Sequence, residues 1–99
     1  MSFPRGHTPT LKLRAKQDVD LSQIAHIYVT LKQGSTKIRK QDDELQVEDR
    51  VISVYLNQKE SLSLYKGEAN VMINWTYPDG RRGGNSKPIK IWIEENLEG

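Results

Sequence analysis

Alternation of apolar and polar residues recurs along this 99-residue chain and constrains its fold more strongly than any other feature. Successive side chains of a β-strand point to opposite sides of the sheet, so apolar residues two positions apart share one face. The alternation therefore predicts strands that bury one face and expose the other, as in antiparallel sheets packed over one core. The clearest trios are Ile27-Val29-Leu31, Ile52-Val54-Leu56, Val71-Ile73-Trp75 and Ile89-Ile91-Ile93.

Seven strands are predicted at intervals of about ten residues, without a convincing helix. Residues 58–66 are expected to cross between two sheets, with one helical turn at most. Short strands at this spacing are typical of an immunoglobulin-like sandwich, so the sequence predicts an all-β, immunoglobulin-like antiparallel β-sandwich of about seven strands. The predicted strands span Thr8–Ala15, His26–Gln33, Thr36–Lys40, Glu44–Val47, Val51–Leu56, Glu68–Tyr77 and Ile89–Ile93.

The length is that of one domain, and no shift in composition divides the chain. Residues 1–7 contain Pro4 and Gly6 and are expected to form a flexible N-terminal arm with nothing of its own to pack on. Residues 8–94 are then a single β-sandwich domain, and residues 95–99 a polar C-terminal tail. The expected core consists of residues of inward parity: Leu13, Ile27, Val29, Leu31, Ile52, Val54, Leu56, Val71, Ile73, Trp75, Ile89 and Ile91.

Composition excludes several classes of protein. Fifteen basic and thirteen acidic residues are spread along the chain, which does not favour a nucleic-acid partner. The absence of cysteine excludes a disulfide framework and thiolate chemistry. The N-terminus lacks the apolar region of a secretory signal, and no uncharged stretch is long enough to span a bilayer. The protein is expected in the bacterial cytoplasm before assembly, and outside a cell only in a larger particle, such as a virion, or after lysis.

Three stretches carry a resemblance to a known family: Arg5-Gly6-His7-Thr8-Pro9-Thr10-Leu11, residues 19–23 followed by 27–34, and residues 67–80 with their Asp79-Gly80 turn. They resemble small phage proteins with an immunoglobulin-like fold, in particular the N-terminal domain of the baseplate upper proteins of tailed phages of Gram-positive bacteria. In that family the stretches correspond to a short opening arm, an aspartate-leucine pair before a strand, and the penultimate hairpin. Baseplate upper proteins continue into long C-terminal regions, whereas this sequence stops at Gly99. The resemblance is therefore expected to imply a stand-alone structural protein of a virion or prophage.

No metal or cofactor site is predicted. His7 and His26 are the only histidines, whereas a metal site built on nitrogen ligands generally needs three or more convergent groups. The motif Asp18-x-Asp20-x-Ser22 is similar to the start of a calcium loop. The loop also requires glycine at its sixth position and glutamate at its twelfth, where this chain has Gln23 and Val29. The motif is therefore interpreted as a turn between strands.

No catalytic residues are predicted either, and the chain is expected not to be an enzyme. The acidic run Asp42-Asp43-Glu44 is the best candidate for acid–base chemistry. Catalytic carboxylates need unequal environments that separate their pKa values, but three consecutive acids in a polar turn share one environment. The run is interpreted as a solvated hairpin.

Candidate interface residues are aromatic or basic. Trp92, Tyr28 and Tyr55 take the outward parity of their strands, and together they would form a patch large enough to need a partner. The alternative is that a loop or the N-terminal arm covers them. Arg81 and Arg82 lie in the glycine-rich loop Gly80–Lys87, which is expected to be a mobile basic loop. The alternative is that its arginines contact an acidic partner surface.

These observations favour a non-enzymatic structural or assembly protein of a phage or prophage particle, in the baseplate or elsewhere. It would act through protein–protein contacts with other particle proteins or by self-association. One alternative is a carbohydrate- or host-surface-binding module that uses the three outward aromatic residues. A second alternative is a small nucleic-acid-associated protein that uses Arg81, Arg82 and Lys87.

Overall fold

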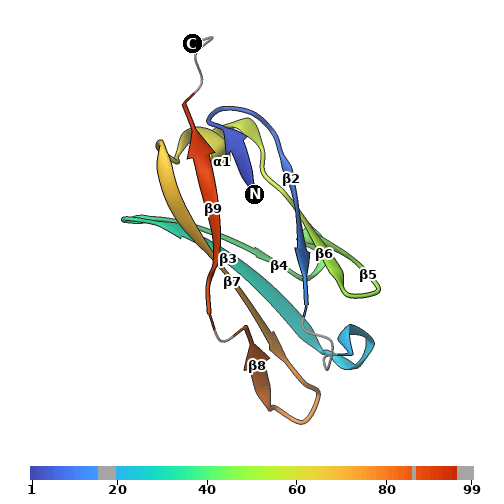
Figure 1. Cartoon of the computed structure of the whole chain (residues 1–99). Coiled ribbons are helices and arrows are strands. Elements are labelled where there is room, and N and C mark those ends of the chain that lie inside the picture. Colours follow the sequence, from blue (N-terminus) through green and yellow to red (C-terminus); the bar gives the residue numbers. More distant parts are fainter. Residues whose placement is uncertain (16–19, 86, 96–99) are drawn as a thin grey trace.

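Two β-sheets pack face to face in the computed structural model, which describes residues 1–15, 20–85 and 87–95 (Figure 1). The larger sheet has the strand order β1-β9-β7-β3-β4, with β8 paired to β7, and the smaller has the order β2-β6-β5. Every pairing is antiparallel among the described residues except that of β1 with β9. The strands are β1 (Ser2–Pro4), β2 (Thr10–Arg14), β3 (His26–Gln33), β4 (Thr36–Gln41), β5 (Leu45–Glu48), β6 (Val51–Tyr55), β7 (Gly67–Thr76), β8 (Arg82–Gly84) and β9 (Ile89–Glu94).

The predicted fold class is confirmed. The orders β9-β7-β3-β4 and β2-β6-β5 match the G-F-C-C′ and B-E-D strands of an immunoglobulin-type sandwich. All seven predicted strands are present, and β1 and β8 are additional. Every residue of the expected core is buried except Ile89, which is half-buried at the start of β9.

The N-terminal segment corrects the predicted arm. Residues 2–4 form β1, which pairs in parallel with β9, and the Phe3 side chain is only 4% exposed in the core. The guanidinium of Arg5 donates to the carbonyls of Leu62 and Leu64 at 2.8 and 2.6 Å, and the Gly6 N–H donates to Ser61 Oγ at 2.8 Å. The segment therefore packs on its own domain. Of the predicted tail 95–99, only residue 95 is described.

The crossover between β6 and β7 contains the single helical turn that the sequence allowed, α1 (Gln58–Leu62). A reciprocal pair of hydrogen bonds between Asn57 and Glu60 caps its start, because each side chain accepts from the other residue's N–H. Gln33 at the end of β3 then bonds both backbone groups of Tyr65 at 2.8 Å. Two 3₁₀ turns complete the helical content of the described residues, η1 (Leu21–Gln23) and η2 (Asp42–Glu44).

Residues 80–87, predicted as a loop, include a strand. This strand, β8, pairs with the end of β7, while β9 pairs with the beginning of β7. Ile73 lies between these two pairings, and Asn85 supplies its partners. Asn85 Oδ1 accepts from the Ile73 N–H at 2.7 Å, and the Asn85 N–H donates to the Ile73 carbonyl at 3.1 Å. Residue 86 lies outside the described part of the chain.

Truncation of Ile73 should destabilise the fold, because its side chain is 2% exposed between the two sheets. We expect Ile73→Ala to lower the free energy of unfolding by about 2–4 kcal/mol in urea denaturation. The matched control is Val47→Ala on β5, where the side chain is 45% exposed and the expected change is below about 0.5 kcal/mol. Equal losses in the two variants would contradict the assignment of the core.

A second prediction concerns pH. Burial raises the pKa of the Glu60 carboxyl, but hydrogen bonds from the Lys40 ammonium and the Asn57 N–H outweigh it and hold this pKa below its ordinary value of 4.5. Lys40 Nζ lies 2.8 Å from Glu60 Oε2 and ties β4 to α1. Because the pKa is lower in the folded state, the carboxylate contributes to the free energy of unfolding in full above pH 4.5. This contribution is lost as the pH falls through the folded-state pKa.

The melting temperature of the wild-type chain should therefore fall more steeply below this pH than that of Glu60→Gln, whose amide does not titrate. Thermal unfolding followed by circular dichroism across the acidic range measures both slopes. Parallel slopes in the two proteins would contradict this role of the carboxylate.

Candidate binding site on the larger sheet

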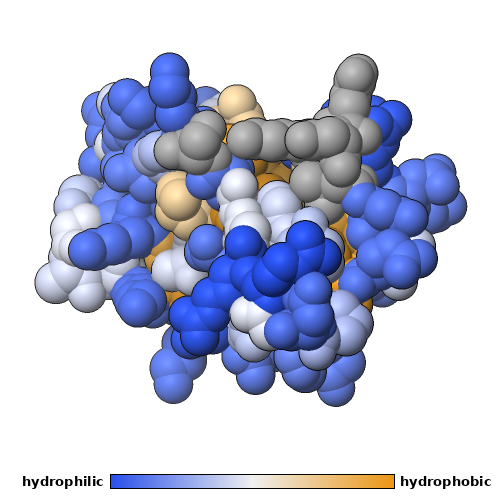
Figure 2. Space-filling model, turned by 90° about the horizontal axis from the view of Figure 1, so that it is seen from below, coloured by the Kyte–Doolittle hydropathy of each residue, from blue (hydrophilic) through white to orange (hydrophobic). Residues whose placement is uncertain are grey.

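The outer face of the larger sheet carries the polar half of each alternating strand, and its side chains are exposed or half-exposed. The end of the molecule near β8 presents mostly hydrophilic atoms, with a few apolar groups between them (Figure 2). A partner at this end would meet charged and hydrogen-bonding groups more than apolar surface.

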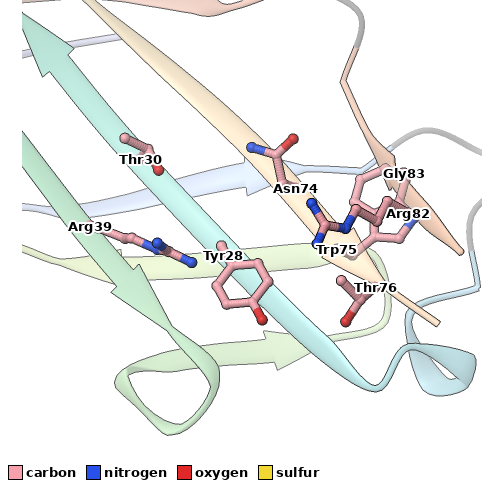
Figure 3. A pocket seen from close by; sticks show the side chains of 8 residues that line it. All are labelled: Tyr28, Thr30, Arg39, Asn74, Trp75, Thr76, Arg82 and Gly83. Atoms are coloured by element: carbon pink, nitrogen blue, oxygen red, sulfur yellow. The ribbon is translucent and has the colours of Figure 1, made fainter. Parts of the chain in front are cut away.

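A hollow of about 330 Å³ opens on this face across β3, β4, β7 and β8 (Figure 3). The strand register brings its polar groups together. Tyr28 lies opposite Asn74, Thr30 lies opposite Arg39, and Thr76 lies opposite Arg82. The lining residues are Tyr28, Thr30, Arg39, Asn74, Trp75, Thr76, Arg82 and Gly83.

Two guanidiniums give the hollow its charge. Arg39 Cζ lies 4.5 Å from the centre of the Tyr28 ring, a cation–π distance. Arg82 reaches the hollow from β8, and Figure 3 shows Tyr28 between the two arginines. Neither guanidinium forms an ion pair with a carboxylate among the described residues. The hollow therefore combines an excess of positive charge with hydroxyl and amide groups.

One wall of the hollow depends on a glycine. Trp75 and Gly83 face each other across β7 and β8, and the missing side chain of Gly83 leaves room for the indole. Trp75 Nε1 donates to the Tyr77 hydroxyl at 3.1 Å, which fixes the plane of the ring. A β-carbon at position 83 would lie 2.7 Å from Trp75 Cε2, far closer than two carbon atoms pack.

His26 and Asp42 flank the hollow at the start of β3. The His26 and Tyr28 ring centres are 6.4 Å apart, and His26 Nδ1 lies 3.1 Å from Asp42 Oδ2. Asp42 Oδ1 accepts from the Ile27 N–H at 3.1 Å, and this bond, followed by the one to His26, lowers the pKa of the Asp42 carboxyl. The three acids of residues 42–44 thus do not share one environment, although Asp43 and Glu44 are exposed as predicted. They form η2 between β4 of the larger sheet and β5 of the smaller sheet rather than a hairpin.

The three predicted aromatic residues do not form one patch. Trp92 is 48% exposed on the outer face of the larger sheet, whereas Tyr55 is 52% exposed on the smaller sheet. Tyr28 shares the face of Trp92, but their partners on β7 are six residues apart, about 20 Å along the strand. Only Tyr28 lies in the hollow.

The two arginines predicted as interface residues do not share one site. Arg81 pairs with Asp79 through Nε at 2.7 Å and lies 4.9 Å from the centre of the Tyr77 ring, whereas Arg82 lines the hollow. Sequence reasoning missed Arg39 and Asn74. Their outward parity was readable from the sequence, but which strands lie side by side was not, because pairing is set by the whole sheet.

No group of three His, Asp or Glu side chains that could hold a metal ion occurs in the described part of the chain. Asp20 accepts from the N–H and hydroxyl of Ser22 and so caps η1, in a motif that the sequence predicted to be a turn. The first residue of that motif, Asp18, lies outside the described residues. Within residues 1–15, 20–85 and 87–95, no helix has the length and apolar character to cross a membrane.

Comparisons with known proteins add no relative: no protein-family model matches the chain, and neither a curated protein nor a solved structure matches it.

The glycine wall gives a prediction. We expect Gly83→Ala to lower the free energy of unfolding by about 1–3 kcal/mol, because the new methyl group forces the Trp75 indole to move. The same substitution in a Trp75→Phe background should cost less, because the smaller ring vacates part of the space. Urea denaturation of the four proteins in this cycle measures the coupling, and strict additivity would contradict the contact.

Proposed function

We propose that the chain is a non-enzymatic assembly domain of a phage or prophage particle. It would contact another particle protein, or a second copy of itself, through the outer face of β9. The observation that carries the proposal is Trp92, whose side chain is 48% exposed at the centre of that part of the sheet. Tryptophan is the residue type most enriched among the anchors of protein interfaces, where a partner pocket receives it.

The surroundings of Trp92 suit such a contact. Across the sheet Trp92 lies opposite Glu68 on one side and Ser2 on the other. Lys90 Nζ lies 3.3 Å from Glu68 Oε1, so a charged pair borders the indole. An apolar centre with a polar rim is the usual anatomy of a protein–protein interface.

The contact is made by side chains on the face and not by addition of a strand at β1. Pro4 has no N–H to donate, and β1 is only three residues long. The phage or prophage setting rests on the resemblance of residues 5–11, 19–23 with 27–34, and 67–80 to baseplate upper proteins. That resemblance concerns the fold, so the station within the particle stays a proposal.

Replacement of Trp92 by alanine should abolish the assembly contact and leave the domain folded, because the indole is outside the core. Particles would be purified by density gradient from cells that produce the tagged chain, and the chain in them quantified by mass spectrometry. We expect wild-type chain in the particles and at least a tenfold loss for Trp92→Ala, about the effect of a 1.4 kcal/mol anchor.

Tyr55→Ala is the matched control, because Tyr55 is equally exposed but lies on the smaller sheet. Its incorporation should stay at the wild-type level. Absence of the wild-type chain from particles would contradict the assembly role, and loss with Tyr55→Ala alone would move the contact to the other sheet. Sedimentation of the isolated chain reports whether the partner is a second copy.

A further inference from the structure

We infer that the hollow between Arg39 and Arg82 is a binding site for an acidic saccharide, a sugar unit that carries a carboxylate or a phosphate. The site lies about 20 Å along β7 from Trp92, so it is separate from the proposed assembly contact and does not rest on it. The argument has four steps: the placement of Arg39, the charge, the size of the hollow and the lack of a stacking surface.

Arg39 is held ready for an anion. Its guanidinium lies over the Tyr28 ring at 4.5 Å, and a guanidinium stacked on an aromatic face keeps the N–H groups at its rim free. Those N–H groups match the two oxygens of a carboxylate or phosphate. The ring thus orients the arginine and lowers the entropy lost when a ligand binds.

The charge of the hollow is not neutralised from within. Arg82, on β8, reaches the hollow from the side of Tyr28 opposite to Arg39 (Figure 3). No described carboxylate pairs with either arginine. The neighbouring acid, Asp42, is engaged by the Ile27 N–H and by His26. Among the described residues that line the hollow, the ionised groups are both cationic.

Size and polarity favour a sugar over a single acidic side chain. The hollow of about 330 Å³ lies at the lower end of the range for small-molecule sites and exceeds what one carboxylate would fill. Its rim offers the hydroxyls of Thr30 and Thr76 and the amide of Asn74, which can donate to and accept from sugar hydroxyls. Together with Arg39 and Arg82, these groups stand on four paired strands, β3, β4, β7 and β8, so the site is largely formed before a ligand arrives.

Nucleic acid fits less well. Binding of single strands relies on aromatic faces on which successive bases stack. Arg39 already covers the Tyr28 ring, and Trp92 is distant and lies opposite Glu68. A basic hollow without a free aromatic face is suited to the anionic group and the hydroxyl groups of an acidic sugar.

The test is titration of the isotope-labelled, full chain by NMR with defined probes. One arm uses a hyaluronan tetrasaccharide, which carries carboxylates, and a second uses a short glycerol-phosphate polymer. Neutral maltotetraose, inorganic phosphate and a ten-nucleotide oligothymidine complete the set. We expect an acidic saccharide to shift the amides of Tyr28, Arg39, Asn74 and Arg82, and the arm that binds identifies the carboxylate or the phosphate as the recognised group.

Arg39→Gln should weaken this binding about tenfold or more, because it removes a charge-assisted pair of hydrogen bonds. Lys37→Gln is the matched control: it removes the same charge from the same face of β4 but does not line the hollow. Its affinity should stay within about twofold of the wild type. Trp92→Ala should bind normally, which separates this site from the assembly contact.

Four results would overturn the inference. The first is equal weakening of saccharide binding by Arg39→Gln and Lys37→Gln. The second is tighter binding of oligothymidine than of either acidic saccharide, and the third is binding of maltotetraose as tight as that of the acidic saccharides. The fourth is a response to inorganic phosphate alone, which would mean an adventitious ion only. Failure of Trp92→Ala to lose particle incorporation would not bear on it.

Discussion

The larger sheet depends on the pairing of β7, which meets β3 along one edge and divides its other edge between β8 and β9. The inward residues of β7 fill the centre of the core, from Ala69 to Trp75. A slip of one residue would turn that whole set toward solvent, so the register is fixed by burial. Asn85 completes this arrangement, because it bonds Ile73 on the edge of β7 where neither β8 nor β9 reaches.

The same pairing decides what the outer face can do. Tyr28 and Trp92 have matching parity, yet they pair with residues of β7 that lie about 20 Å apart along the strand. One end of the face therefore gathers arginines around an aromatic ring, and the other presents an indole bordered by charges. The two partners that we propose would therefore contact different residues of the face.

Polar contacts to the backbone hold the segments that lack a strand pattern. Arg5 bonds carbonyls at the end of α1, and Gln33 bonds both backbone groups of Tyr65. A buried carbonyl or N–H without a partner is costly, so such contacts attach the connections to the sandwich. The alternation of apolar and polar residues does not reveal these hydrogen bonds. The N-terminal segment was therefore predicted to be a flexible arm, although Phe3 and Arg5 attach it to the domain.

The sequence by itself determined the parity of every long strand. That parity predicted the fold class, the buried side of Ile52, Ile73 and Trp75, and the outward direction of Trp92, because alternation is a local consequence of strand geometry. Only the tertiary structure decided which strands are neighbours. Part of the glycine-rich loop forms β8, where only a glycine at position 83 leaves room for the Trp75 indole, and Arg39 and Arg82 lie around Tyr28. Such groupings depend on register between distant segments, which a single sequence pattern does not encode.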